Sequence, residues 1–301
     1  MAKTRLGIIG GSGVYQMAAI EAAQWRRISS PWGAPSDELL FGNIGATECV
    51  FLPRHGRGHR LTPGTINYRA NIDAMKRAGV TDVISISACG SFKESLPPGT
   101  FVFVDQFVDL TKQRESSFFG TGLVAHVSMA HPVCSRLREQ LVIAAQAAGI
   151  AHQDGGTYVC MEGPQFSTLA ESLYYRAQGW DVIGMTNATE AKLAREAELP
   201  YACVAMVTDF DCWHPDHDAV EVADIVRVLN ENAEKSATLI QRTAPNLGPE
   251  RQPSPMRIEY TLDTAIMTAP DRRDPQLMAK LDAVAGRALG IAMRENPEGT
   301  G

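Results

Sequence analysis

The chain has 301 residues, of which 45% are apolar and 21% charged, so it can bury the core of one large domain or of a domain with an appendage. Its formal net charge of −6 and its pI near 5.7 argue against nucleic acid or a membrane surface as the main partner. No leader peptide is recognisable, and no apolar run reaches the about 20 residues that a membrane-spanning helix needs. The six cysteines include no CxxC pair, which predicts neither a metal site nor a disulfide framework. We therefore expect a cytoplasmic protein.

Helical stretches that stop at glycine or proline and then run into an apolar strand recur along the chain. The first clear helix has Tyr68, Ile72 and Met75 on one face, and a second has Leu137 and Leu141 at the same 3.6-residue period. In chain order, the predicted strands cover residues 6–9, 49–52, 82–86, 157–160, 180–183 and 201–207. This alternation predicts an α/β sandwich with a central sheet.

Two pairs of residues have the spacing of a helix capping box, in which the cap side chain and a Glu three residues later bond reciprocally to the backbone. Thr168 with Glu171 fits this pattern, and so does Asn187 with Glu190. We therefore predict that helices begin at these two points, directly after two segments that carry candidate site residues. A further helix is predicted over residues 219–236.

Turn-forming residues cluster near the C-terminal end of the chain and predict a linker, followed by an appendage too small to form a core of its own. The predicted divisions are residues 1–243 for the main domain, 244–256 for the linker and 257–301 for the appendage. Within the appendage, Ile258–Leu262 resembles a short strand. Asp274 and Pro275 predict the cap and first position of a helix. The residues that this helix would carry inward, so that the appendage packs on the main domain, are Leu277, Leu281, Val284 and Ala288.

The first chemical motif is Gly10-Gly11-Ser12-Gly13, which ends the strand over residues 6–9. Its glycines let backbone N–H groups point at an anion, and the Ser12 hydroxyl adds a donor. The motif also fits a dinucleotide-binding fingerprint in part, but Gln16 stands where the third glycine belongs, and Asp37 lies in a turn-like segment. A tight turn without a ligand is a third interpretation.

Two more polar segments follow apolar strands, at the ends where open α/β sheets collect ligands. Arg54-His55 follows residues 49–52, and Ser87–Ser91 follows residues 82–86. We take Arg54 and His55 as fixed cations, with a guanidinium fork that matches phosphate oxygens. Considered singly, these residues are more often solvated cations, satisfied polar groups or plain turns. Three glycine-bearing turns in one chain favour a cradle for a phosphate-like anion.

The segments Met161–Thr168 and Met185-Thr186 supply candidates for a planar ligand. Phe166 alone is most simply a core residue, and Ser167 alone is most simply a helix cap. Together they form a plausible aromatic wall and hydrogen-bond donor for a purine-like base.

The acidic pair Asp209 and Asp211 follows the most apolar strand of the chain. If that strand continues, carboxylates at i and i+2 point the same way, and like charges held together raise the pKa of one toward the range that a general acid needs. The pair could instead cap a helix beginning near Asp218 or Ala219. Convergent ligands at metal-binding spacing are absent from the sequence around the pair, which argues against a metal site.

Taken together, these motifs resemble the purine nucleoside phosphorylase family, and most closely its 5′-methylthioadenosine phosphorylase branch. The resemblance is collinear over roughly residues 4–243, and the co-occurrence of several motifs makes it far more specific than any one of them. The motifs that carry it are Gly10–Gly13, Pro53–Gly56 with Gly58-His59, Ser87–Ser91, Asp105–Phe107, Glu162–Pro164, Met185-Thr186 and Thr208–Trp213.

The resemblance implies a three-layer α/β sandwich with a central mixed sheet flanked by helices, and it implies roles for individual residues. The phosphate positions are Ser12, Arg54, His55, Ser87, Ala88 (through its backbone) and Thr186; the base and ribose positions are Phe166, Ser167, Met185, Asp209 and Asp211. His126 matches a residue that reaches into the neighbouring subunit's site, which implies a homotrimer. Val222 and Ile225 match the pocket around the 5′ substituent, although by sequence alone they are simply apolar helix positions.

The implied reaction is phosphorolysis of 5′-methylthioadenosine to adenine and 5-methylthioribose 1-phosphate, with catalysis by Asp209 and Asp211, inorganic phosphate as co-substrate and no cofactor. Ser167, Asp209 and Val222 favour this substrate, because the 6-oxopurine branch typically has Glu, Asn and His at these positions. Gln165 and Leu169 stand where close relatives usually have Arg, so methylthioinosine or another purine nucleoside is the alternative substrate. Two rival functions are a nucleosidase, which uses water in place of phosphate, and a non-catalytic nucleotide-binding module.

Overall fold

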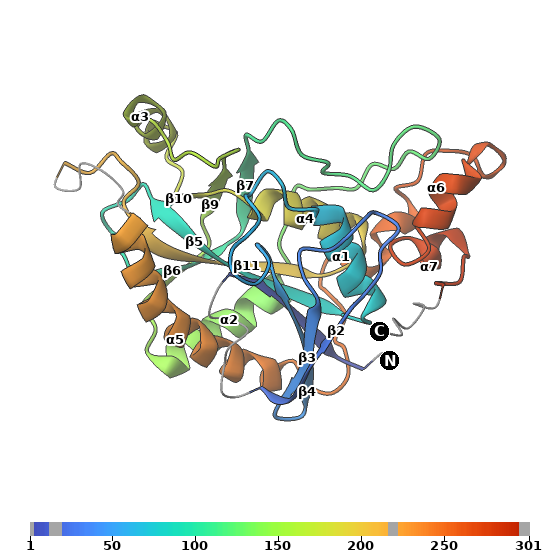
Figure 1. Ribbon diagram of the computed structural model, residues 1–301, viewed down its shortest axis with the longest axis horizontal. Helices are drawn as coiled ribbons and strands as arrows, with labels where there is room; N and C mark the ends of the chain where they lie inside the picture. Colours follow the sequence, from blue (N-terminus) through green and yellow to red (C-terminus); the bar gives the residue numbers. More distant parts are fainter. Residues whose placement is uncertain (1–2, 12–19, 216–221, 295–301) are drawn as a thin grey trace.

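The computed structural model describes residues 3–11, 20–215 and 222–294, and its centre is a mixed sheet of eleven strands (Figure 1). In chain order the strands are β1 (Arg5–Gly10), β2 (Glu21–Arg26), β3 (Leu39–Ile44), β4 (Thr47–Pro53), β5 (Asp82–Ser91), β6 (Phe101–Val104), β7 (Gln106–Asp109), β8 (His152–Asp154), β9 (Thr157–Cys160), β10 (Val182–Gly184) and β11 (Tyr201–Asp209). The six strands predicted from the sequence correspond to β1, β4, β5, β9, β10 and β11.

Helices cover both faces of the sheet, so the predicted three-layer α/β sandwich is confirmed (Figure 1). They are α1 (Tyr68–Arg77), α2 (Ser135–Ala148), α3 (Leu169–Ala177), α4 (Asn187–Glu196), α5 (Val222–Asn246), α6 (Pro275–Lys280) and α7 (Gly286–Leu289), with short 3₁₀ helices η2 (Ile258–Asp263) and η3 (Pro270–Arg272). Helices α2 and α5 pack together on one face, and α1 and α4 pack together on the other. None of the helices described is long and apolar enough to cross a membrane.

Strand β5 lies at the centre of the sheet, and three different strands pair with it. It runs parallel to β1 and to β11, and its last residues pair antiparallel with β10. The register between β5 and β11 shifts between Val207 and Asp209, so that Asp209 lies opposite Gly90. Such a bulge re-aims the side chains that follow it. The end of β11 therefore turns toward the end of β5, where β10 and β11 lie on either side of it.

Strand β11 shows how one strand serves two cores. Cys203 and Ala205 belong to the core shared with α1 and α4, while Val204 and Met206 belong to the core shared with α2 and α5. All four side chains are buried, as expected for a strand covered on both faces, since successive side chains point to opposite sides of a sheet. This explains the continuous apolar run that predicted the strand.

The two predicted capping boxes have different outcomes. Thr168 and Glu171 form the reciprocal pair at the start of α3, as predicted. At the start of α4 the cap is Thr186, without a side-chain cap bond, and Asn187 is already the first helical residue. The capping box predicted for Asn187 and Glu190 is therefore wrong, because both side chains turn inward and bond to residues of other elements.

The C-terminal segment differs from its predicted elements. Residues 258–262, predicted as a strand, lie in the 3₁₀ helix η2, because the Ser254 backbone N–H and hydroxyl both donate to the Glu259 carboxylate and close a tight local turn. The single helix predicted after Asp274 is two helices, α6 and α7. Asp274 caps α6 and Pro275 is its first residue, as predicted. Helix α5 extends to Asn246, three residues into the segment predicted as a linker.

The segment after α5 is anchored on the main sheet domain by buried carboxylates. Asp282 accepts from Arg77 of α1 and from the Arg294 side chain, and Glu198, next to α4, accepts from Arg287. Leu281 and its neighbours enter the same core as α1 and α4. The C-terminal segment is thereby packed against the face of the sheet that carries α4 (Figure 1).

Gly184 at the end of β10 tests the close packing of this region. A Cβ atom there would lie 1.9 Å from Tyr158 Oη and 2.6 Å from its Cζ, so it would overlap the hydroxyl end of this fully buried side chain. We expect Gly184→Ala to lower the free energy of unfolding by about 2–3 kcal/mol, because overpacking forces the backbone or the ring to move. Gly64→Ala, where a Cβ meets nothing within 4 Å, is the matched control. Equal urea-unfolding midpoints for the two variants would contradict this account.

Candidate active site

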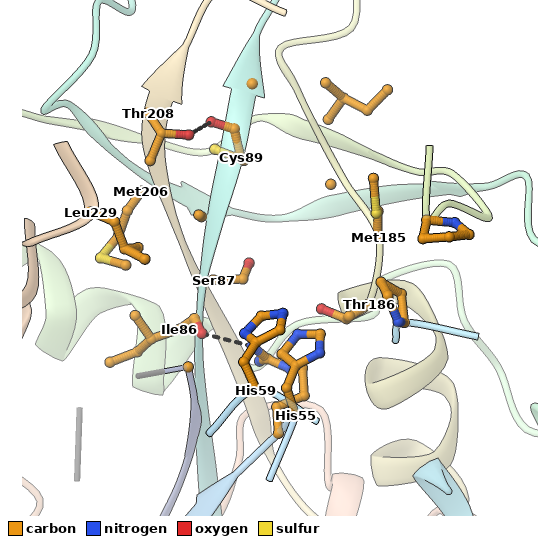
Figure 2. A pocket seen from close by; sticks show the side chains of 18 of the residues that line it. His55, His59, Ile86, Ser87, Cys89, Met185, Thr186, Met206, Thr208 and Leu229 are labelled. Carbon is orange, nitrogen blue, oxygen red and sulfur yellow. Dashed lines mark hydrogen bonds between the residues drawn. The ribbon is translucent and has the colours of Figure 1, made fainter. Parts of the chain in front are cut away.

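A cavity of about 420 Å³ lies where the parallel strands β1, β4, β5 and β11 end (Figure 2). Its walls come from residues far apart in the sequence, and Gly11 marks the end of β1 on its lining. The other lining segments are 54–55, 59–63, 86–90, parts of 161–166, 183–186 and parts of 206–211, with Leu229, Ala233 and Ser236 from α5. The segments singled out in the sequence therefore meet around one space. Ser87–Ser91, however, predicted as a turn after a strand, is the second half of β5, because its pairing with β11 and β10 continues to Ser91.

Arg54 lies beneath this space and is 2% exposed. Its Nε donates to Glu190 Oε1 over 2.5 Å and its Nη2 donates to Glu190 Oε2 over 3.2 Å, while Nη1 donates to the Ile86 carbonyl over 2.9 Å. Burial alone disfavours the charged guanidinium, but Glu190 reverses this and holds the pKa of Arg54 above its usual value. The guanidinium fork, expected to face phosphate, is therefore bonded to Glu190 through Nε and Nη2. The second N–H of Nη1, which the bond to the Ile86 carbonyl does not use, is left to donate to a ligand.

Glu190 is the acceptor on which a buried polar network converges. Besides Arg54, it accepts from the Ser85 hydroxyl over 2.6 Å and from the Tyr201 hydroxyl over 3.1 Å. Asn187 donates its two amide N–H groups to the oxygens of Ser85 and Tyr201, over 2.7 and 3.0 Å. All five side chains are at most 2% exposed. The network therefore links the end of β4, the first half of β5 and the first residue of β11 to the first turn of α4.

The same network reaches the two hydroxyls of the cavity floor. The amide of Asn187 donates to Ser85 and Tyr201, so its Oδ1 is free to accept, and it lies 2.7 Å from Ser87 Oγ and 3.2 Å from Thr186 Oγ1. Both hydroxyls line the cavity (Figure 2). Asn187 thereby sets the position of Ser87 and Thr186 from below.

His55 is neutral in this structure, contrary to its expected role as a cation. Burial, and then the neighbouring Arg54 charge, lower the pKa of His55 to about 4. Its Nδ1 lies 2.8 Å from the Leu61 carbonyl, which requires a proton on that nitrogen and leaves Nε2 as an acceptor. The ring stacks on His59 with 4.3 Å between centroids (Figure 2). His55 therefore presents a hydrogen-bond acceptor, suited to a protonated phosphate oxygen or a sugar hydroxyl.

Asp209 and Asp211 line the other side of the cavity, but not as two side chains of one continuing strand. Strand β11 ends at Asp209, and Asp211 has a left-handed backbone with φ of 52°. Asp209 accepts from the Asp211 backbone N–H over 2.8 Å, which folds the turn back on the first carboxylate. Burial raises the pKa of both carboxyls; the charge of Asp211 is only a minor cause for Asp209. Mutual repulsion is therefore not the main source of the shift.

Proton counting around Thr208 indicates how Asp209 can hold a proton. The single hydroxyl of Thr208 lies 3.2 Å from the Cys89 carbonyl (Figure 2). It also lies 2.7 Å from Asp209 Oδ2. A carbonyl can only accept, so when Thr208 donates to Cys89, a protonated Asp209 can donate to Thr208 and satisfy all three groups. The arrangement therefore accommodates the protonated form of Asp209 that a general acid needs.

The remaining predicted site residues are placed as follows. Phe166, Met185 and Ala88 line the cavity, and Phe166 is 49% exposed at its mouth. Ser167 does not line it; its hydroxyl faces the Met161 sulfur. His126 is exposed and does not line the cavity of its own chain. Ser12 and the side chains of Val222 and Ile225 lie outside the described residues.

Several residues of the site were missed by sequence reasoning. Glu190 and Asn187 were interpreted only as a capping box, and Ser85 and Tyr201 only as strand residues. Leu229 and Ala233 line the cavity from α5, and their spacing from Ile225 places them along the same helix face. That spacing was available in the sequence. The described residues contain no group of three or more His, Cys, Asp or Glu side chains able to hold a metal ion.

Fold and site together define an α/β enzyme with one cavity, which has hydrogen-bonding groups on one side and two acidic side chains on the other. A model of the phosphorylase superfamily matches residues 5–244. S-methyl-5′-thioadenosine phosphorylase of Bradyrhizobium diazoefficiens is 65% identical over 96% of this chain and 99% of its own, and that of Rhodospirillum rubrum is 59% identical over 95% and 97%. A crystal structure of a methylthioadenosine phosphorylase from an antarctic soil metagenomic library is 44% identical, with a TM-score of 0.88 over 94% of this chain and 99% of its own.

The chain belongs to the phosphorylase superfamily. It is a pentosyltransferase, as expected, and the resemblance to the methylthioadenosine phosphorylase branch is confirmed. A methylthioadenosine phosphorylase of Schistosoma mansoni solved with adenine is also similar, at 36% identity and a TM-score of 0.81 over 86% of this chain and 96% of its own.

The buried pair of Arg54 and Glu190 predicts a large loss of stability when one partner is neutralised. Glu190→Gln leaves the guanidinium as an unpaired buried charge, and we expect it to lower the free energy of unfolding by about 3–5 kcal/mol. Tyr201→Phe removes one neutral partner of the same carboxylate and should cost about 1 kcal/mol. Urea unfolding of both variants measures the difference, and an equal loss would show that the ion pair does not dominate the network.

Proposed function

We propose that this chain catalyses phosphorolysis of 5′-methylthioadenosine to adenine and 5-methylthioribose 1-phosphate. The observation that carries this proposal is the joint lining of one cavity by Arg54, Ser87 and Thr186 on one side and Asp209 and Asp211 on the other. Such an arrangement can hold a tetrahedral anion and a purine at the same time. The near full-length identity to enzymes named S-methyl-5′-thioadenosine phosphorylase supports it.

On the phosphate side, the heavy atoms of the proposed donors are held in position before the substrate enters. The remaining Nη1 N–H of Arg54 and the backbone at Ala88 donate to the anion. The Ser87 and Thr186 hydroxyls, which donate to Asn187 Oδ1 in this structure, turn their hydrogens to the anion when it binds. Because a buried network sets these groups in place, little reorganisation is needed when charge develops in the transition state. Phosphate then attacks the anomeric carbon as the bond to the base loosens and positive charge grows on the sugar.

On the base side, Asp209 donates a proton near N7 so that the purine leaves as a neutral base. Burial raises the pKa of the Asp209 carboxyl against the opposing hydrogen bond from Thr208, which supports a protonated Asp209. Asp211, also buried, accepts from the exocyclic amine of an adenine-type base. A 6-oxopurine offers an acceptor at that point, which an ionised carboxylate would repel.

The 5′ side of the substrate is assigned to α5. Leu229 and Ala233 give this part of the cavity an apolar lining, and Val222 and Ile225 precede them on the same helix. An apolar wall suits a methylthio group better than a hydroxyl. Neither Gln165 nor Leu169 lines the cavity, so these departures from close relatives do not favour methylthioinosine.

The proposed assembly is a homotrimer in the cytoplasm. His126 sits on an exposed loop segment whose backbone donates to Ala265, away from the cavity of its own chain. This placement supports a role in a neighbouring subunit's site. The six cysteines are free thiols, as a reducing compartment requires.

The function is tested by incubating the protein with methylthioadenosine, adenosine, methylthioinosine or inosine, with and without phosphate, and measuring free base and sugar phosphate. We expect rapid, phosphate-dependent release of adenine from methylthioadenosine and much slower reaction of the 6-oxo nucleosides. Base release that does not require phosphate would identify a nucleosidase. A preference for methylthioinosine would overturn the proposed substrate.

The proposed role of Asp209 predicts a specific kinetic defect. Asp209→Asn cannot supply the proton to the base, so we expect turnover to fall about 10²- to 10⁴-fold with phosphate affinity nearly unchanged. Initial rates at saturating nucleoside and direct phosphate binding separate these effects. Asp154→Asn, at an exposed carboxylate outside the cavity, is the control. Unchanged turnover of Asp209→Asn would contradict the role.

A further inference from the structure

The floor of the cavity carries little net positive charge. The Arg54 guanidinium is matched by the Glu190 carboxylate in direct contact, so the pair is neutral as a unit. His55 contributes no charge at neutral pH, since its pKa lies at about 4. The opposite wall holds the two carboxyls of Asp209 and Asp211. The negative charge of a phosphate dianion in this space must therefore be balanced by a positive group other than Arg54 and His55.

Arg60 is the other arginine on the cavity lining. Among the described residues that line the cavity, it is the one Lys or Arg side chain without a carboxylate within salt-bridge distance. The residues outside the described ranges, 1–2, 12–19, 216–221 and 295–301, include no Lys or Arg. Arg60 is thus the unmatched cation on the part of the cavity lining that the structure describes.

The turn that follows β4 holds Arg60 in this place. The backbone of His59 is left-handed, with φ of 53°, and Leu61 N–H donates to the His55 carbonyl over 3.0 Å, which closes the turn. The Arg60 side chain crosses Gly56, where a Cβ would lie 2.8 Å from Nε, and its Nη2 donates to the Ser36 carbonyl. A carbonyl positions the guanidinium without cancelling its charge.

Arg60 also lies at the solvent-exposed edge of the cavity. It is exposed, and it lines both the main cavity and an adjacent cavity of about 450 Å³ that Asp37 and Glu38 border from the other side. Both of these acidic groups are paired with Arg57. A cation at a rim of this kind acts on an approaching anion over several ångströms and raises its rate of entry.

We propose that Arg60 is a specificity-determining residue that draws inorganic phosphate into the cavity and offsets its charge there, above a floor that Glu190 has made neutral. This inference rests on the proposed phosphorolysis. It assigns to Arg60 a role that neither Arg54 nor the floor hydroxyls can fill, because none of them brings an unmatched positive charge.

Three variants separate the charge of Arg60 from its shape. Arg60→Gln keeps a donor for the Ser36 carbonyl but loses the charge, Arg60→Lys keeps the charge, and Arg242→Gln removes an equal charge from an exposed side chain of α5 outside the cavity. We expect kcat/KM for phosphate at low salt to fall about tenfold in Arg60→Gln and less than about threefold in the two comparison variants. The nucleoside KM and the thermal midpoint should stay close to wild type in all three.

Ionic strength gives a second readout that a merely structural role would not move. In the wild type, kcat/KM for phosphate should decline as KCl rises, because salt screens exposed charges, and this decline should be much weaker in Arg60→Gln. Equilibrium dialysis with labelled phosphate and no nucleoside should show the same order of affinities.

The outcomes separate this inference from the proposed function. A wild type that releases no base with phosphate would overturn both. An active wild type with Arg60→Gln indistinguishable from Arg242→Gln would overturn only the role of Arg60. So would an equal loss in Arg60→Lys and Arg60→Gln, or a parallel rise in the KM of phosphate and nucleoside, since each points to damaged geometry and not to lost charge.

Discussion

The ion pair between Arg54 and Glu190 is the contact on which the arrangement of this site depends. It joins the end of β4 to the first turn of α4, and Ser85 and Tyr201 bring β5 and β11 to the same carboxylate. Burying two charges is costly unless each lone pair and each N–H finds a partner, and here Glu190 accepts four hydrogen bonds. Four separate elements are therefore held at one relative position.

That constraint extends to the groups that would meet a ligand. The position of Asn187 is set by Ser85 and Tyr201, and the positions of the Ser87 and Thr186 hydroxyls are set by Asn187. The same pairing removes the free charge of the guanidinium, so the floor offers well-fixed hydrogen bonds in place of a strong positive field. Preorganised donors of this kind are effective at developing charge, because they need not reorient during the reaction.

The acidic wall depends on a different constraint, the meeting of β5 and β11 at Gly90. A Cβ at Gly90 would lie 2.9 Å from Asp209 Oδ1 and 3.3 Å from Asp211 Cβ, so only glycine lets the acidic turn approach the strand. The bulge in β11 opposite Gly90 and the left-handed backbone at Asp211 aim both carboxyls into the cavity. Burial of the carboxyls at this junction then raises their pKa values.

The sequence by itself determined the alternation of strands and helices, the cap at Thr168 and the motifs at the strand ends, because periodicity and capping are properties of neighbouring residues. It also pointed to Arg54, His55, Asp209 and the family. Only the tertiary structure decided that Glu190 neutralises Arg54, that His55 is uncharged and that residues 258–262 form a 3₁₀ turn. Glu190 is 136 residues from Arg54, and no local pattern reports a contact of that range or the burial that sets these charges.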